Sequence, residues 1–143
     1  MCDRCRRILV CVAATAIAYA SHGFATATSV PAWSLIPAPA VVKPAEKGVL
    51  EIGQDARVVV RGTDTTAMAT VLDDFMHRVG SVRGLTLRKG GDDGAPAAVT
   101  FDVRPDATVV GDEGYAITVG QQGIVVTART ARGAFYGSVT VWQ

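Results

Sequence analysis

Hydrophobic and polar positions repeat with two different periods along this chain, and the two periods predict helices and strands respectively. Residues 64–84 carry apolar side chains at spacings of three and four, the period of an α-helix with one buried face. This apolar stripe consists of Met68, Val71, Leu72, Phe75, Met76 and Val79. Asp64 or Thr65 can cap the start of the helix, because each has a free side-chain oxygen. Gly80 or Gly84 can end it.

A second helical pattern closes the sequence, with Thr130 as a capping residue. Small and apolar residues follow at helical spacing: Ala131, Ala134, Phe135, Ser138, Val139 and Trp142. Gly133-x-x-x-Gly137 lies within this short, partly polar helix, where it favours close packing against a sheet or a neighbouring domain over a membrane dimer. The pattern stops at Gln143 without a closing turn, so we expect the chain to be a piece of a longer protein.

Shorter segments predict strands. Val99, Phe101 and Val103 alternate with polar neighbours, and Val58–Val60 is a β-branched run typical of a well-buried strand. The predicted strands are residues 48–52, 57–61, 85–88, 98–103, 115–119 and 124–128. The last two predict an antiparallel hairpin, and the glycine-rich residues 90–94 a mobile hairpin connection. Runs of strands with few helices indicate an α+β fold, a mostly antiparallel sheet with two helices packed on one face.

The first 25 residues have the pattern of a secretory signal peptide. Three arginines precede an apolar run over residues 8–20, and small residues offer cleavage after Ala20 or Ala25. The run is shorter than the roughly 20 residues needed to span a bilayer, and an uncleaved membrane anchor is the alternative. We therefore expect a periplasmic or secreted protein. All three cysteines (Cys2, Cys5 and Cys11) lie in this segment, so the mature chain would have no disulfide.

Residues 26–44 are rich in proline and alanine and predict an extended lead-in, because proline fixes φ and removes a donor. One α+β domain, residues 45–143, would follow. Lys and Arg number 14 against 13 Asp and Glu, which argues against a nucleic-acid partner, since such a partner requires a concentrated basic face. After removal of the signal peptide we expect no membrane association.

The remaining candidate chemistry is sparse. Asp112 and Glu113 are adjacent, but they fall in a turn before a strand, where carboxylates are ordinarily solvated. His77 has no partner at metal-binding spacing, and Asp73-Asp74 is predicted to lie on the helix surface. We therefore predict no catalytic, cofactor-binding or metal-ligating residue in this chain.

Three stretches in order resemble a known family. WSLIPAP at 33–39 resembles an opening hIPxP segment. EGYAITV at 113–119 with GIVVTA at 123–128 resembles an EGYxLxV…GIxIxA hairpin. ARGAFYG at 131–137 resembles the start of a closing AGxFYGxQTLxQL helix. Together they are similar to the N-terminal, non-catalytic domain of bacterial glycoside hydrolase family 20 β-N-acetylhexosaminidases.

This resemblance implies an antiparallel sheet backed by two helices, followed by a catalytic (β/α)8 barrel that releases terminal N-acetylhexosamine from glycoconjugates or chitooligosaccharides. The implied mechanism is retaining and substrate-assisted. The family's catalytic Asp-Glu pair follows His-x-Gly-Gly; Asp112-Glu113 follows Val109-Val110-Gly111 and therefore does not inherit that role.

By their place next to the junction, Phe135, Tyr136 and Trp142 are the candidate residues for packing against the barrel of the same polypeptide. The alternatives are a free-standing secreted module that binds carbohydrate or another partner, and an inactive truncated gene product.

Overall fold

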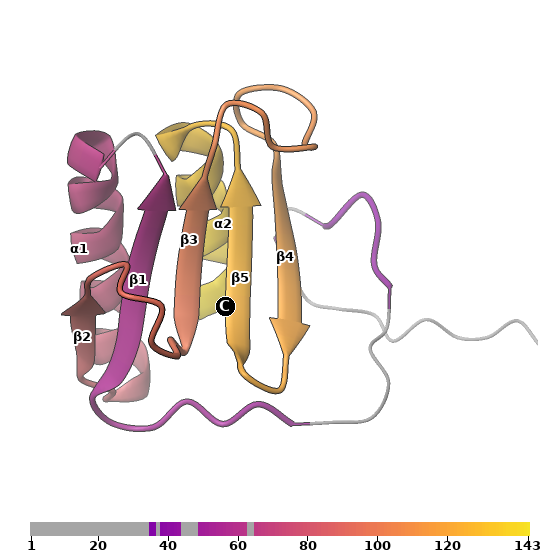
Figure 1. Ribbon diagram of the computed structural model, residues 1–143. Helices are drawn as coiled ribbons and strands as arrows, with labels where there is room; N and C mark the ends of the chain where they lie inside the picture. Colours follow the sequence, from indigo (N-terminus) through magenta and orange to yellow (C-terminus); the bar gives the residue numbers. More distant parts are fainter. Residues whose placement is uncertain (1–34, 37, 44–48, 63–64) are drawn as a thin grey trace, which may run out of the picture. The chain divides into compact units, whose positions relative to one another are not determined.

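The computed structural model describes residues 35–36, 38–43, 49–62 and 65–143 (Figure 1). Its elements are β1 (Ala56–Gly62), α1 (Thr65–Arg83), β2 (Leu87–Gly90), β3 (Val99–Val103), β4 (Tyr115–Gly120), β5 (Gly123–Ala128) and α2 (Ala131–Trp142). The expected signal peptide with its cysteines, most of the predicted lead-in, and the candidate cap Asp64 lie outside the described residues.

The five strands form one mixed sheet in the order β2-β1-β3-β5-β4. β1 is parallel to both β2 and β3, and β3 is parallel to β5. Only β4 runs antiparallel to its neighbour, in the predicted hairpin with β5, which is confirmed. The prediction of a mostly antiparallel sheet is wrong, because three of the four strand pairs are parallel. Both helices lie on one face of the sheet (Figure 1).

Two crossover connections make β1, β2 and β3 parallel, and β3 and β5 are parallel because β4 runs back between them in the sequence. Parallel neighbours need a connection that returns the chain to the end of the sheet where it started. α1 does this between β1 and β2, so that Ala56 pairs with Leu87 in register. Residues 91–98 do it between β2 and β3, passing in front of β1 on the face opposite the helices (Figure 1). The predicted hairpin connection at residues 90–94 is therefore wrong, since β2 and β3 flank β1 and do not pair with each other.

The core lies between the helices and the sheet. Phe75 of α1 and Phe101 of β3 meet edge to face, with ring centroids 5.4 Å apart and an angle of 80° between the rings. Buried apolar side chains from α1, β1, β3 and β5 surround this pair: Met68, Val71, Leu72, Val58, Val99, Val103, Val126 and Ala128. The apolar stripe predicted for α1 is thus the face that covers the sheet.

One predicted strand does not form, one predicted boundary shifts, and of the two predicted ends of α1 the structure has Gly84. Residues 49–52 form no strand. Leu50 and Ile52 instead line a recess beside the ends of both helices, so their alternating apolar side chains pack there without pairing with a neighbouring strand. α1 runs through Gly80 and ends before Gly84, which has φ +66° and donates its N–H to the Gly80 carbonyl at 2.9 Å. β2 begins at Leu87, two residues later than predicted.

Candidate functional site

Two glycines of α2 allow this helix to pack closely against the β4–β5 hairpin. A methyl group at Gly133 would collide with the backbone oxygen of Gly114, and one at Gly137 would collide with Cγ1 of Val126. Gly133, Gly137 and the small residues between and after them are buried in this contact. The predicted packing of Gly133-x-x-x-Gly137 against the sheet is confirmed.

Polar contacts fix the position of α2 along the hairpin. The Thr130 hydroxyl caps the helix by accepting the Gly133 N–H at 3.2 Å, as predicted, and donates to the carbonyl oxygen of Asp112. Near the other end, the hydroxyl groups of Tyr115 and Thr140 are hydrogen-bonded at 2.7 Å. The hairpin and α2 therefore form one structural unit.

Of the three residues predicted to pack against a barrel, Phe135 and Trp142 also pack against the core of this domain, and Tyr136 is the more exposed. Phe135 and Tyr136 are neighbours whose rings lie 5.6 Å apart at 67°; Phe135 is half-buried and Tyr136 is 37% exposed. Trp142 is half-buried at the far end of α2, with the Arg78 guanidinium 5.8 Å above its ring.

Trp142 lines an apolar recess of about 270 Å³ beside the ends of α1 and α2. Its other walls include Leu50, Ile52, Phe75 and Val79. The indole Nε1 is buried and has no hydrogen-bond partner among the described residues. A buried N–H without a hydrogen-bond partner lowers the stability of the folded state. Among the described residues, such a group lies at this end of α2.

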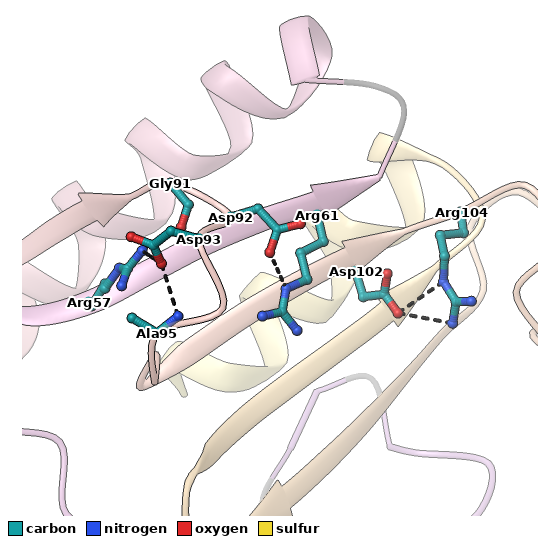
Figure 2. Close-up of polar contacts among 8 residues, drawn as sticks. All are labelled: Arg57, Arg61, Gly91, Asp92, Asp93, Ala95, Asp102 and Arg104. Atoms are coloured by element: carbon teal, nitrogen blue, oxygen red, sulfur yellow. Dashed lines mark hydrogen bonds and ion pairs between the residues drawn. The ribbon is translucent and has the colours of Figure 1, made fainter.

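The opposite face of the sheet carries a row of ion pairs that sequence analysis missed (Figure 2). Residues 91–98, which we call the strap, cross this face and are tied to β1 at two points. Arg57 pairs with Asp93 at 2.5 Å and also donates to the Gly91 carbonyl, and Arg61 pairs with Asp92 at 2.7 Å. Arg57 and Arg61 are spaced by four along a strand, so their side chains project from the same face.

The row continues across the sheet, where Arg104, just after β3, pairs with Asp102 at 3.0 Å (Figure 2). The available sequence signal was the spacing of Arg57 and Arg61, which lie four apart on either side of the valine run and therefore project from one face of β1. Which acids these arginines meet depends on the path of the strap.

The carboxylate of Asp93 is stabilised in its charged form. The backbone N–H of Ala95 donates to it, at 3.0 Å, and is the largest cause of a pKa below the usual range for aspartate; the hydrogen bond from Arg57 adds to the effect. Asp93 is solvent-exposed, so the lowered pKa reflects its hydrogen bonds and adds little to the free energy of unfolding.

The sequence profile of glycosyl hydrolase family 20, domain 2, matches residues 32–143. The chain belongs to this family. Two solved structures share its fold: the chitobiase of Flavobacterium johnsoniae, at 18% identity and a TM-score of 0.57, and the N-acetyl-β-hexosaminidase of Streptomyces plicatus in complex with thio-NAglucal, at 24% identity and a TM-score of 0.54. The matches cover 68% and 66% of this chain but only 16% and 18% of those proteins. No curated protein sequence matches the chain significantly.

In this family 20 domain, the candidate acid/base residues lie at the surface. Asp112 and Glu113 are exposed in the turn before β4, as predicted, and Glu113 lies 3.7 Å from Arg132. His77 is exposed on α1, and the neighbouring Asp74 pairs with Arg78 one helical turn away, at 2.7 Å.

The described part of this family 20 domain contains no group of three or more His, Cys, Asp or Glu residues that could hold a metal ion. Neither of its described helices is both long enough and apolar enough to cross a membrane.

Proposed function

We propose that this chain is the N-terminal accessory domain of a secreted β-N-acetylhexosaminidase, and that it supports the catalytic barrel of the same polypeptide without catalysing the reaction. The observation that carries the proposal is the family 20 domain 2 match over residues 32–143, together with the small share of the solved relatives that the chain spans. The parent enzyme would release terminal N-acetylhexosamine from glycoconjugates or chitooligosaccharides by the retaining, substrate-assisted route.

The recesses of the described structure support an accessory role. A glycosidase site places carboxylates in a pocket where they reach the glycosidic oxygen. The recess beside His77 is lined by residues of α1 and by residues 85–87 at the start of β2, and the recess beside Trp142 is mostly apolar. Neither of these two recesses is lined by an aspartate or a glutamate. This lining supports the proposal that the barrel, and not this domain, carries out catalysis in the parent protein.

The test is hydrolysis of 4-nitrophenyl N-acetyl-β-D-glucosaminide. We expect turnover by the native polypeptide that contains this chain and none by residues 1–143 alone. A native polypeptide without hexosaminidase activity would overturn the proposal. Secretion is tested separately by N-terminal sequencing of the exported protein, for which we expect a start at Ser21 or Thr26.

The role of Phe135, Tyr136 and Trp142 is tested in the full-length enzyme. We expect Trp142→Ala to weaken the contact between this domain and the barrel, because Trp142 lies in the last turn of α2, next to the junction. If Trp142→Ala changes neither the unfolding temperature nor the resistance of the junction to protease, packing of this residue on the barrel is refuted.

A free-standing carbohydrate-binding module is the weaker alternative. A sugar platform needs coplanar aromatic rings on an open face. Among the described aromatic residues, Phe75 and Phe101 are buried in the core, and the rings of Phe135 and Tyr136 are inclined by 67°. We therefore favour packing against a domain over glycan stacking.

A further inference from the structure

Three hydrogen bonds hold Gln143 at the end of α2. Its side-chain Nε2 donates to the carbonyl oxygen of Ile36, and its Oε1 accepts the N–H of the same residue, both at 2.9 Å. Its backbone carbonyl accepts from Nη2 of Arg83, the last residue of α1, also at 2.9 Å. We call Gln143, Ile36 and Arg83 the clasp.

The geometry of the clasp is more restrictive than three separate surface contacts. A primary amide that donates to and accepts from the backbone of one residue imitates the pairing of two β-strand residues, so both the plane and the direction of the Gln143 side chain are determined. Arg83 supplies a donor to one of the carbonyl groups that the end of a helix leaves without an intrahelical partner. A chain segment at this position would otherwise fray.

The clasp joins parts of the chain that are distant in sequence. Ile36 is 107 residues from Gln143, and Arg83 is 60 residues from it. The segment through which the chain enters the domain is therefore held at the end of α2. The Ile36 side chain is 79% exposed there, while its backbone is occupied by Gln143. Because Gln143 holds the Ile36 backbone, this exposed apolar side chain is presented at a defined position, from which it can contact a further domain.

We propose that the clasp positions this domain on its catalytic barrel, with Gln143 as the positioning residue and the Ile36 side chain as a contact to the barrel of the same polypeptide. The inference rests on the proposed function, under which the chain continues beyond Gln143 into the barrel. The occupant is argued from the solved relatives, of which the match covers only 16% and 18%. Most of such a polypeptide lies outside this domain, and under the proposed function it continues from Gln143, the residue that the clasp holds.

The positioning role is tested in the full-length polypeptide with Gln143→Met, which keeps the length of the side chain and removes both its donor and its acceptor. The matched control is Gln122→Met, at an exposed glutamine in the turn between β4 and β5. We expect Gln143→Met to raise hydrogen exchange at the Ile36 amide and protease cleavage after α2 by about tenfold, the effect of losing two modest hydrogen bonds on local opening. Gln122→Met should leave both rates unchanged.

The contact itself is tested with Ile36→Ser, which keeps the backbone partners of Gln143. The control is Val110→Ser, a 95% exposed valine between β3 and β4. We expect Ile36→Ser to split the joint thermal unfolding of the two domains into separate transitions while exchange at residue 36 stays low. Unchanged cleavage in Gln143→Met, or a single unfolding transition in Ile36→Ser, would overturn the proposal. These readouts need no substrate, so they are independent of whether the enzyme hydrolyses hexosaminides.

Discussion

Gly137 of α2 and Val126 of β5 lie so close together that no side chain fits between them. A methyl group at Gly137 would collide with Cγ1 of Val126 and would also reach the ring of Tyr115 at 3.4 Å. Val126 is fully buried on an interior strand, β5, and is held there by close packing. The close approach of α2 to the β4–β5 hairpin therefore depends on the absence of a side chain at Gly137, as it does at Gly133.

We predict that Gly137→Ala destabilises the domain. The collision should cost about 1–3 kcal/mol of unfolding free energy, partly offset by the roughly 1 kcal/mol that alanine gains over glycine in a helix. Gly80→Ala in α1 is the matched control, because its new methyl would meet only the Leu85 carbonyl at an ordinary 3.5 Å. Urea unfolding should show Gly80→Ala to be at least as stable as wild type. If Gly137→Ala is as stable as Gly80→Ala, the close packing of Gly137 against Val126 is refuted.

The edge-to-face pair at the centre of the core gives a second prediction. Phe101 is completely buried and contacts Phe75. Truncation to alanine should lower the unfolding free energy by about 3–5 kcal/mol, because it removes a large apolar group and leaves a cavity. Val110→Ala, at an exposed position, should change stability by less than about 0.5 kcal/mol in the same denaturation experiment.

The hydrogen bond between the Tyr115 and Thr140 hydroxyl groups joins the hairpin to α2. We expect Tyr115→Phe to lower the free energy of unfolding by about 0.5–1.5 kcal/mol, because it removes a partly buried hydrogen bond. A double-mutant cycle with Thr140→Val separates this interaction from side effects of either change. Strictly additive losses in the double mutant would show that the two hydroxyl groups do not interact.

The strap should respond to acid through Asp93. The folded-state pKa of this carboxyl lies below its unfolded value, because the charged form accepts hydrogen bonds from Ala95 and Arg57. Its contribution to stability is therefore present above the unfolded pKa and disappears as the pH falls through the folded pKa. NMR titration should find an Asp93 pKa below about 3.9, the usual value for aspartate.

Removing the arginine tests the cause of this shift. Arg57→Met should move the Asp93 pKa upward but not fully to the usual value, because the Ala95 N–H remains. The stability difference between wild type and Asp93→Asn should shrink as the pH is lowered through the acid range. Asp106→Asn, at another exposed carboxylate, is the control for the general effect of removing one negative charge. If the pKa of Asp93 is the same in wild type and in Arg57→Met, the contact between Arg57 and Asp93 is refuted.

Patterns among residues close together in sequence were enough to predict both helices and the β4–β5 hairpin. The stripe from Met68 to Val79 predicted α1, and Thr130 predicted the start of α2. Alternation on either side of residues 120–123 predicted the hairpin. These features depend on residues close together in sequence, so a periodicity and a capping side chain are enough to find them. The hairpin, the start of α2 and the segment at residues 33–39 carried the resemblance to family 20, which the match over residues 32–143 confirms.

Strand direction and strand order were decided only by the tertiary structure. Alternating side chains look alike in parallel and antiparallel strands, and the prediction of a mostly antiparallel sheet was wrong for that reason. The run Val58–Val60 predicted a well-buried strand, and Val58 and Val59 are buried, but the run could not show that the strap crosses β1 on the face opposite the helices (Figure 1). The partners of Arg57 and Gln143 were equally hidden, because each contact joins residues more than 30 positions apart. The sequence by itself determined the local elements and the family; the folded chain decided how the strands run and which distant residues meet.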